Sequence, residues 1–297
     1  MVDIVKYRKI YYSLSGFLML GSITSLAFFG LNLGIDFTGG SILEIDFKHS
    51  RPSNQEIEKA LEGLNIGLTS IQPTNDKGVI IKMANITEEM HQLIKQKLLE
   101  LGGGFEEKSF ESIGPVVGKE LANKTKIFTL LVLIAIIIFI AIAFRKSSKP
   151  LSSFSYGVVA SYVAFFQDVL IPLGVFSLLG RFYHVQITIP IVVGVLTILG
   201  YSVHDTIVVF DRIRENLSRK KGLSFEKIVN ESLNQILGRS INTSLTTLLV
   251  LFSIFLFGGQ TLKYFALILI LGISLGTYSS IFFAAPLLVT LQNLRRS

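Results

Sequence analysis

The sequence contains no cysteine, and only 16% of its 297 residues are charged. The missing thiols exclude a disulfide framework, a thiolate metal site and a cysteine nucleophile. A P-loop and an HExxH pair are also missing, so ATP-driven chemistry and zinc-dependent hydrolysis have no visible apparatus. The sequence therefore predicts a protein that is not an enzyme, needs no metal or organic cofactor, and draws its energy from elsewhere.

Half of the residues are hydrophobic, and they are concentrated in long runs, as is typical of an integral membrane protein. Six runs are long enough to predict transmembrane helices. They cover residues 12–33, 127–144, 154–179, 187–210, 241–257 and 264–291. The first run follows a basic segment, as in a secretory signal, but its length and the lack of a cleavage site predict a retained helix.

Charge is distributed unevenly along the chain. Residues 35–123 hold 9 Lys and Arg against 14 Asp and Glu, whereas the remainder holds 19 against 7. Basic residues cluster at the N-terminus, in RKSSK at 145–149, between Arg212 and Arg239, and at 295–296. Because positive charge is retained in the cytoplasm, we expect both termini there and the acidic segment outside. No basic face with interleaved aromatics occurs, so nucleic acid is not expected as a partner.

Residues 35–123 predict a small external α+β domain without a catalytic constellation. Strand patterns lie at 41–47, 70–74, 79–83 and 105–112, and amphipathic helices at 53–63 and 87–101. Ser53 and Glu56 form a capping box before the first of these helices. The order βαββαβ predicts a ferredoxin-like domain. It separates residues 1–34, with the first span, from a five-helix membrane domain at 124–297.

Within the membrane domain, the segment 211–239 repeats apolar residues at helical spacing among charges. This pattern predicts an amphipathic helix on the cytoplasmic surface. At its start, Asp211 and Arg214 have the i,i+3 spacing of an ion pair, and Arg212 can anchor at the headgroups. A GxxxG pattern at 272–276 predicts close helix packing, with ordinary glycine enrichment in membrane helices as the alternative.

Asp205 is an acidic residue within the predicted span 187–210. An ionised Asp in a membrane helix costs roughly 2.5–3.5 kcal/mol on insertion scales, so it usually faces a partner, a cavity or a proton path. Tyr201 and Ser202 share its helix face, and Arg239 begins the next span at a similar depth. Asp205 and Arg239 therefore predict a proton-coupled switch, with a permanent ion pair that only joins two helices as the alternative.

Asp168 is a second acid within a predicted span. Counted from Leu151, it lies roughly 25 Å from the cytoplasmic side, which predicts a place near the outer interface and a role in a proton entrance. A solvated carboxylate is the alternative, and Pro172 predicts an irregular helix at this point. His204 points about 100° away from Asp205 and is expected to be packed or hydrogen-bonded.

Five longer motifs carry a resemblance to a known family. They are LGIDFTGG at 33–40, IGPVVGKEL at 113–121, LGYSVHDTIVVFDRIREN at 199–216, GRSINTSLTTLLVL at 238–251 and LFGG at 256–259. Together they resemble the SecF family of protein-export subunits, in the resistance-nodulation-division group of proton-driven transporters, over nearly the entire chain. The motif residues singled out are Gly34, Asp36, Gly39, Gly40, Asp211 and Arg212. The glycine pair permits a tight turn into the first strand.

The resemblance implies a multi-pass protein of the bacterial inner membrane, with six helices and one external domain. It implies SecD as partner subunit, together with the SecYEG channel, the SecA motor and exported unfolded polypeptide. In that family the acid of the GYSxxD motif and the arginine opening the fifth helix are associated with proton-driven movement of the external domain. Asp205 and Arg239 occupy these positions. The implied function couples the proton motive force to late steps of polypeptide export.

Two other functions use the same elements. Half of a proton-coupled exporter of small molecules or lipids would use the same helices and acid, but resembling exporters have much larger external domains than residues 35–123 provide. A structural scaffold without a transport cycle would require both acids to be permanently paired. Export of a secreted precursor under an intact or collapsed proton gradient separates these functions.

Overall fold

The computed structural model describes residues 2–143, 159, 162–220 and 222–294. It divides into two compact units, a membrane unit of Met1–Asn32 with Ile127–Ser297 and an α+β unit of Leu33–Lys126. The RKSSK link, Phe144, the predicted helix start at 154–158 and residues 295–296 lie outside the described residues.

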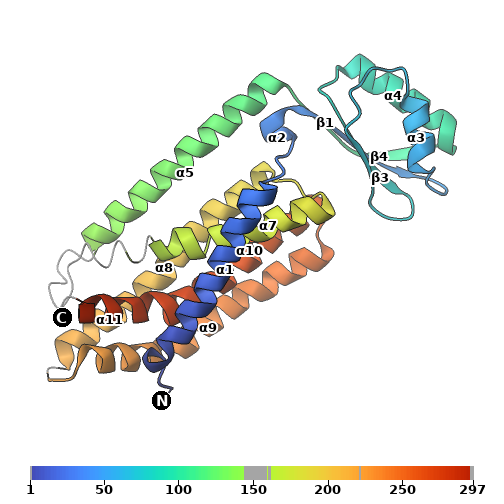
Figure 1. The fold of residues 1–297 in the computed structure, drawn as a ribbon. Helices are drawn as coiled ribbons and strands as arrows, with labels where there is room; N and C mark the ends of the chain where they lie inside the picture. Colours follow the sequence, from blue (N-terminus) through green and yellow to red (C-terminus); the bar gives the residue numbers. More distant parts are fainter. Residues whose placement is uncertain (1, 144–158, 160–161, 221, 295–297) are drawn as a thin grey trace. The chain divides into compact units, whose positions relative to one another are not determined.

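In the α+β unit, one short helix that was not predicted, α2 (Ile35–Thr38), comes first, and the other strands and helices follow in the predicted order. These are β1 (Gly40–Phe47), α3 (Asn54–Leu61), β2 (Ser70–Pro73), β3 (Gly78–Met83), α4 (Glu88–Gly102) and β4 (Phe105–Ile113). The strands form one antiparallel sheet in the order β2-β3-β1-β4, and α3 and α4 lie against it (Figure 1). The capping box is confirmed, because Ser53 and Glu56 exchange hydrogen bonds between side chain and backbone.

Strand periodicity places the core of the α+β unit on the helix-covered face of the sheet. In β1, Leu43, Ile45 and Phe47 are buried, and they pack with Ile57 of α3 and Ile94 of α4. Side chains of a strand alternate between the two faces, so Glu44 and Asp46 fall on the other face. An aliphatic and aromatic core therefore holds this unit together.

The glycine pair of LGIDFTGG lies where β1 meets the start of the long helix α5 (Pro115–Ala143). Gly39 has φ +76° and Gly40 has φ +137°, values that side chains other than glycine rarely adopt. A Cβ on Gly39 would lie 2.7 Å from Cα of Pro115, so glycine is required for this approach as well. The predicted tight turn is confirmed, and it packs against the start of the IGPVVGKEL motif.

The membrane unit consists mainly of long apolar helices (Figure 1). Besides α5, they are α1 (Arg8–Phe29), α7 (Leu170–Tyr183), α8 (Ile189–Arg219), α9 (Phe225–Phe257), α10 (Gln260–Ser279) and α11 (Ala285–Leu294). The described residues include four helical segments long and apolar enough to cross a membrane: Val5–Phe29, Ile189–Arg219, Phe225–Phe257 and Leu262–Leu294. Helix α7 is a shorter apolar helix, and α5 contains the described part of the predicted span 127–144.

The predicted surface helix between the fourth and fifth spans is not a separate element. Helix α8 continues through DRIREN to Arg219, and α9 runs without interruption from Phe225 to Phe257. The apolar side chains that suggested a surface helix, including Ile228 and Leu233, are buried inside the membrane unit. Amphipathic periodicity reports a buried face, but it does not distinguish a membrane surface from a neighbouring helix as the cover.

Two of the predicted spans contain π-helical turns. The turn η2 (Val163–Gln167) precedes α7, and the turn η3 (Ser280–Ala284) separates α10 from α11. The irregularity predicted near Pro172 is therefore present, although it lies one turn before the proline. A π-helical turn accommodates one extra residue, and such turns occur often at functional sites.

Glycines bring α8 and α10 into close contact. A Cβ placed on Gly272 would lie 2.6 Å from Cγ2 of Ile198 and closer still to Cγ1. A Cβ on Gly276 would lie 3.4 Å from Cβ of Ser202. Both positions of the predicted GxxxG pattern therefore face α8, which confirms that the pattern marks a helix contact.

Serine side chains line the contact between α1 and α7. Ser25 Oγ donates to the Gly174 carbonyl at 3.1 Å, and Ser177 Oγ donates to the Ser25 carbonyl at 3.1 Å. Ser22 lies against Gly174, where a Cβ would come within 2.6 Å of Ser22 Cα. Hydroxyl groups that bond across helices satisfy polar atoms where no water is present.

Candidate functional site

Asp205 lies in the middle of α8 and is partly buried in the membrane unit. The hydroxyl group of Ser240 on α9 forms a hydrogen bond with its carboxylate. The second carboxylate oxygen, Oδ2, is buried and has no hydrogen-bond partner among the residues that the structure describes. The acid therefore has one hydroxyl companion and one unsatisfied oxygen.

Arg239 does not pair with Asp205 in this structure. Its side chain is exposed on α9, and within the described ranges no ion pair involves Asp205. Ser240, the next residue, is buried and faces the acid instead. Neighbouring positions on a helix point about 100° apart, so α9 can present only one of these two residues to Asp205 at a time.

The prediction for Asp168 was wrong in its depth. Asp168 is fully buried, with 0% of its surface exposed, and its bond to Ser202 places it level with the middle of α8, close to Asp205. The predicted helix ended at residue 179, but α7 continues to Tyr183, which leaves Asp168 roughly 23 Å before the end of that helix. A solvated role for this carboxylate is excluded in this structure by the same burial.

Two hydroxyl groups hold Asp168 at one oxygen. Ser202 of α8 and Ser279 of α10 both donate to its Oδ2, the latter at 3.0 Å. The other oxygen, Oδ1, is buried without a partner in the described part of the chain. Ser202 was predicted as a neighbour of Asp205 on the same helix face, but its hydroxyl serves Asp168 instead.

The two acids belong to one buried polar region. Ser202 lies three residues before Asp205 on α8, and the charges of Asp168 and Asp205 are close enough to interact. Tyr201 is half-buried, and neither acid is hydrogen-bonded to it among the described residues. The sequence predicted opposite depths for the acids, whereas α7, α8 and α10 bring them together.

Further polar side chains extend this region through the helix contacts. Gln167 donates to Ser15 of α1 at 2.8 Å, and Ser15 lies 3.5 Å from the hydroxyl group of Tyr278. Thr206 of α8 and Ser280 share a hydrogen bond of 2.8 Å. These residues were not predicted, because uncharged polar residues in an apolar run give no signal that distinguishes a buried network from scattered positions.

His204 was expected to be packed or hydrogen-bonded, and this prediction was wrong. It is exposed and lines a groove of about 360 Å³ between α5 and α8. Gly200, one turn earlier, lines the same groove, and a Cβ added there would meet no atom within 4 Å. The 100° separation from Asp205 is correct, but it turns the imidazole out of the bundle.

The DRIREN segment, residues 211–216, lies within α8, and its side chains bond to α9. The predicted pair of Asp211 and Arg214 is present at 2.5 Å. Arg212 bonds Glu215 at 2.5 Å and Gln235 of α9 at 2.7 Å, and Asn216 also bonds Gln235, at 2.8 Å. Headgroup anchoring alone therefore does not account for this segment, because its polar side chains fasten the two helices together.

The N-terminal segment is also attached to the first half of α9. Two asparagines one turn apart, Asn230 and Asn234, hydrogen-bond the backbone of Val2, and Asn230 also accepts from the amide of Val5. Arg8 forms an ion pair of 2.6 Å with Glu226. These contacts fix the end of α9 that precedes Arg239.

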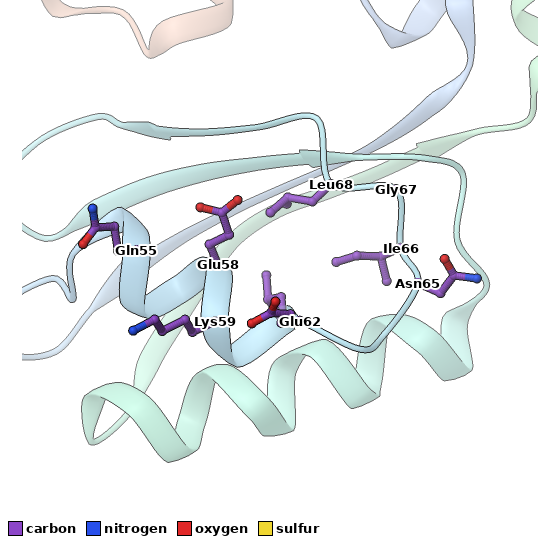
Figure 2. Close-up of a pocket in the computed structure, with 9 residues that line it drawn as sticks. Gln55, Glu58, Lys59, Glu62, Asn65, Ile66, Gly67 and Leu68 are labelled. Carbon is purple, nitrogen blue, oxygen red and sulfur yellow. The ribbon is translucent and has the colours of Figure 1, made fainter.

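The α+β unit contains a separate groove of about 450 Å³ beside α3, which Figure 2 shows. Its lining consists of Gln55, Glu58, Lys59, Leu61, Glu62, Asn65, Ile66, Gly67 and Leu68. Because the lining mixes both signs of charge, it does not select a ligand by charge. Among the residues that the structure describes, no cluster of acidic and histidine side chains could hold a metal ion.

Comparisons with known proteins identify the family. Residues 93–294 match the model for protein export membrane protein SecD/SecF, C-terminal, and residues 24–50 match the SecD/SecF GG motif. A protein translocase subunit SecF of Thermobaculum terrenum is 42% identical over 99% of this chain and 95% of its own length. A subunit of the same name from Synechocystis sp. is 35% identical over 96% of this chain and 93% of its own.

The solved structures agree with this result. The crystal structure of SecDF from Thermus thermophilus, a translocon-associated membrane protein, matches with a TM-score of 0.84 and 29% identity. The match covers 98% of this chain and 39% of that chain, so this chain spans well under half of that molecule. The chain belongs to the SecD/SecF family of protein export membrane proteins.

Proposed function

We propose that this chain acts as the SecF subunit of a protein translocase and couples the proton motive force to late steps of polypeptide export. The observation that carries the proposal is a pair of interacting acids among long apolar helices, one fully and one partly buried, in a chain whose relatives are named protein translocase subunits. An acid inside a membrane is costly and is retained where an ion or a proton is handled. No hydrolytic step is assigned to the chain.

The proposed architecture has six transmembrane helices and a ferredoxin-like external domain. The four long apolar helices, together with α5 and the α7 region, supply six spans. The βαββαβ order and the sheet order β2-β3-β1-β4 support the ferredoxin-like assignment. The charge pattern supports an inner-membrane location with both termini in the cytoplasm.

The partners of the proposed complex follow from the proteins that resemble this chain. SecD would supply the remainder of the SecDF molecule, of which this chain spans 39%. The SecYEG channel would deliver the unfolded polypeptide that SecA drives, and the external domain would move as the helices shift. Protons are the proposed coupling ion.

The proposed switch uses the alternation of Ser240 and Arg239 on α9. A protonated Asp205 carries no charge and suits a neutral companion such as the hydroxyl group of Ser240, whereas an ionised Asp205 is better paired with the guanidinium group of Arg239. A rotation of α9 by about 100° exchanges the two. Proton release from Asp205 would thereby be linked to movement of α9.

Export of a secreted precursor into membrane vesicles tests this proposal. Vesicles containing the full complex with Asp205→Asn should lose the stimulation that the proton gradient gives, because Asn cannot release a proton. The matched control is Asp211→Asn, which changes an exposed acid on the same helix and should keep the stimulation. An undiminished gradient response in Asp205→Asn would reject the proposal.

A further inference from the structure

Asp168 is fully buried and accepts two hydroxyl donors at one oxygen, whereas Asp205 is partly buried and has one hydroxyl companion. The Oδ2 atom of Asp168 accepts hydrogen bonds from Ser202 and Ser279, so one oxygen is satisfied twice. Its Oδ1 is buried and without a partner among the described residues. A proton attached to Oδ1 would turn that unpaired oxygen into the hydroxyl oxygen of a neutral carboxyl group. The buried negative charge would then be removed.

Among the residues that the structure describes, no positively charged group is paired with Asp168. Among the described titratable groups, Asp205 of α8 interacts with it, and Tyr278 of α10 is connected through Ser15 to Gln167, the residue before Asp168. Burial without a paired cation, beside a second acid, makes an ionised carboxylate costly here.

Asp168 and one of its two donors, Ser279, each lie next to a π-helical turn. Asp168 follows the last residue of the π-helical turn η2, and Ser279 precedes the first residue of η3. The two turns contact each other. An extra residue in a helix turn can be absorbed by a small rearrangement, so these turns are places where the helices can shift.

We propose that Asp168 is a second proton-binding site of this chain, and that Ser202 and Ser279 transmit its occupancy to α8 and α10. The inference deepens the proposed function and rests on it for its physiological role. With the proton on Oδ1, the two serines tie α8 and α10 to the start of α7. When the proton leaves, Oδ1 requires a donor.

The donor nearest in sequence is the amide of Gln167, which is engaged with Ser15 of α1. Recruiting it would release that contact and alter η2, since Gln167 is the last residue of the turn. Loss of the proton would therefore change the contacts of this segment with α1 as well as with α8 and α10. Asp205, in contrast, acts through α9.

Infrared difference spectroscopy of the full complex in lipid tests the assignment directly. Spectra taken between acidic and alkaline pH show the carbonyl stretch of a protonated carboxyl group, which shifts in D₂O. In the Asp205→Asn background, we expect such a band to remain. It should disappear when Asp168→Asn is added and persist when the exposed control Asp211→Asn is added.

Two further variants keep the test decisive if Asp168→Asn fails to fold. Ser202→Ala and Ser279→Ala each remove one donor to Oδ2, so each should shift the frequency of the band without abolishing it. A band that survives Asp168→Asn, or the absence of any band in the Asp205→Asn background, would overturn the inference. So would an unshifted band in both serine variants.

Failure of this inference is distinguishable from failure of the proposed function. If the Asp168 band is absent while export still requires Asp205 and the gradient, only the second site is rejected. If the band is present while export ignores the gradient, the proton-binding site stands and the export function falls.

Discussion

Both units of the molecule bury apolar side chains, but they differ in how many polar side chains they bury with them. In the α+β unit the core is aliphatic and aromatic, and few polar residues, among them Lys82 and His91, are buried. In the membrane unit, many serines and other polar residues are buried, while large apolar side chains such as Phe17 and Phe28 are exposed. Where lipid surrounds the helices, apolar burial gives little preference for packing, so small and polar residues determine the contacts.

The largest effect that this comparison predicts is in the α+β unit. Phe47→Ala removes a buried aromatic side chain, 1% exposed, and should destabilise this unit by about 3–5 kcal/mol. Hydrogen exchange of the full chain, read by mass spectrometry, should show faster exchange in β1 and β3 with the membrane helices unchanged. Phe17→Ala, which changes an exposed phenylalanine of α1, is the matched control. If Phe47→Ala reduced amide protection equally in both units, the two units would not be stabilised independently, contrary to this prediction.

In the membrane unit, the corresponding prediction concerns glycine. Gly272→Ala places a Cβ within 2.6 Å of Ile198 and should cost about 1–3 kcal/mol through overpacking. Gly200→Ala, where nothing lies within 4 Å, should instead be neutral or stabilising by up to about 1 kcal/mol, because alanine favours a helix. Thermal unfolding in detergent checks both. Similar values for the two variants would show that α8 and α10 do not rely on this contact.

A smaller effect is expected for a single hydroxyl group. Ser177→Ala removes the bond from α7 to the Ser25 carbonyl and should cost about 0.6 kcal/mol, the average for hydrogen bonds between membrane helices. Ser253→Ala is the control, because that exposed hydroxyl group bonds the Leu249 carbonyl of its own helix, α9. A loss of several kcal/mol in Ser177→Ala would mean that hydroxyl groups dominate the α1–α7 contact, which this account does not predict.

The smallest predicted effect is a pH dependence of the stability of the α+β unit, which arises from Glu44 on the face of the sheet opposite the helices. Burial raises the pKa of Glu44, the neighbouring Asp46 and Glu111 raise it further, and Lys108 opposes them. The folded unit therefore holds this proton more tightly than the unfolded chain, so stability falls as pH rises from the ordinary carboxyl pKa through the raised value. Glu44→Gln should protect β1 amides more than the native chain above that range.

The difference between Glu44→Gln and the native chain should vanish at acidic pH, where the native carboxyl is protonated as well. Hydrogen exchange compared at equal pH measures it, with the exposed Glu58→Gln as control. If the β1 amides were less protected in Glu44→Gln than in the native chain at neutral pH, the ionised Glu44 would stabilise the unit, contrary to this prediction.

Local patterns allowed much of the fold to be predicted. The capping box at Ser53, the turn at Gly39-Gly40 and the alternation along β1 depend on residues close in sequence, and the structure contains all three. The extent of α8 and α9 could not be predicted in the same way. Charges after residue 210 suggested a membrane boundary, whereas their side chains bond between the helices.

The candidate site was predictable in part, because acids in apolar runs stand out. Asp205 and Asp168 were singled out on this basis, and both lie in the membrane unit's buried polar region. Their companions were not predictable, since the choice of Ser240 over Arg239 depends on the rotation of α9. Ser279 lies 111 residues from Asp168 in sequence, and no local pattern connects them.

The most direct test of the central claim is a distance measurement between α8 and α9 under a proton gradient. Because the chain lacks cysteine, Thr197→Cys and Leu249→Cys, both at exposed positions, can carry spin labels in the reconstituted complex. We expect the distance distribution of the native chain to change when the gradient is applied and that of Asp205→Asn to stay the same. An unchanged distribution in the native chain, or the same gradient response in Asp205→Asn, would contradict this prediction.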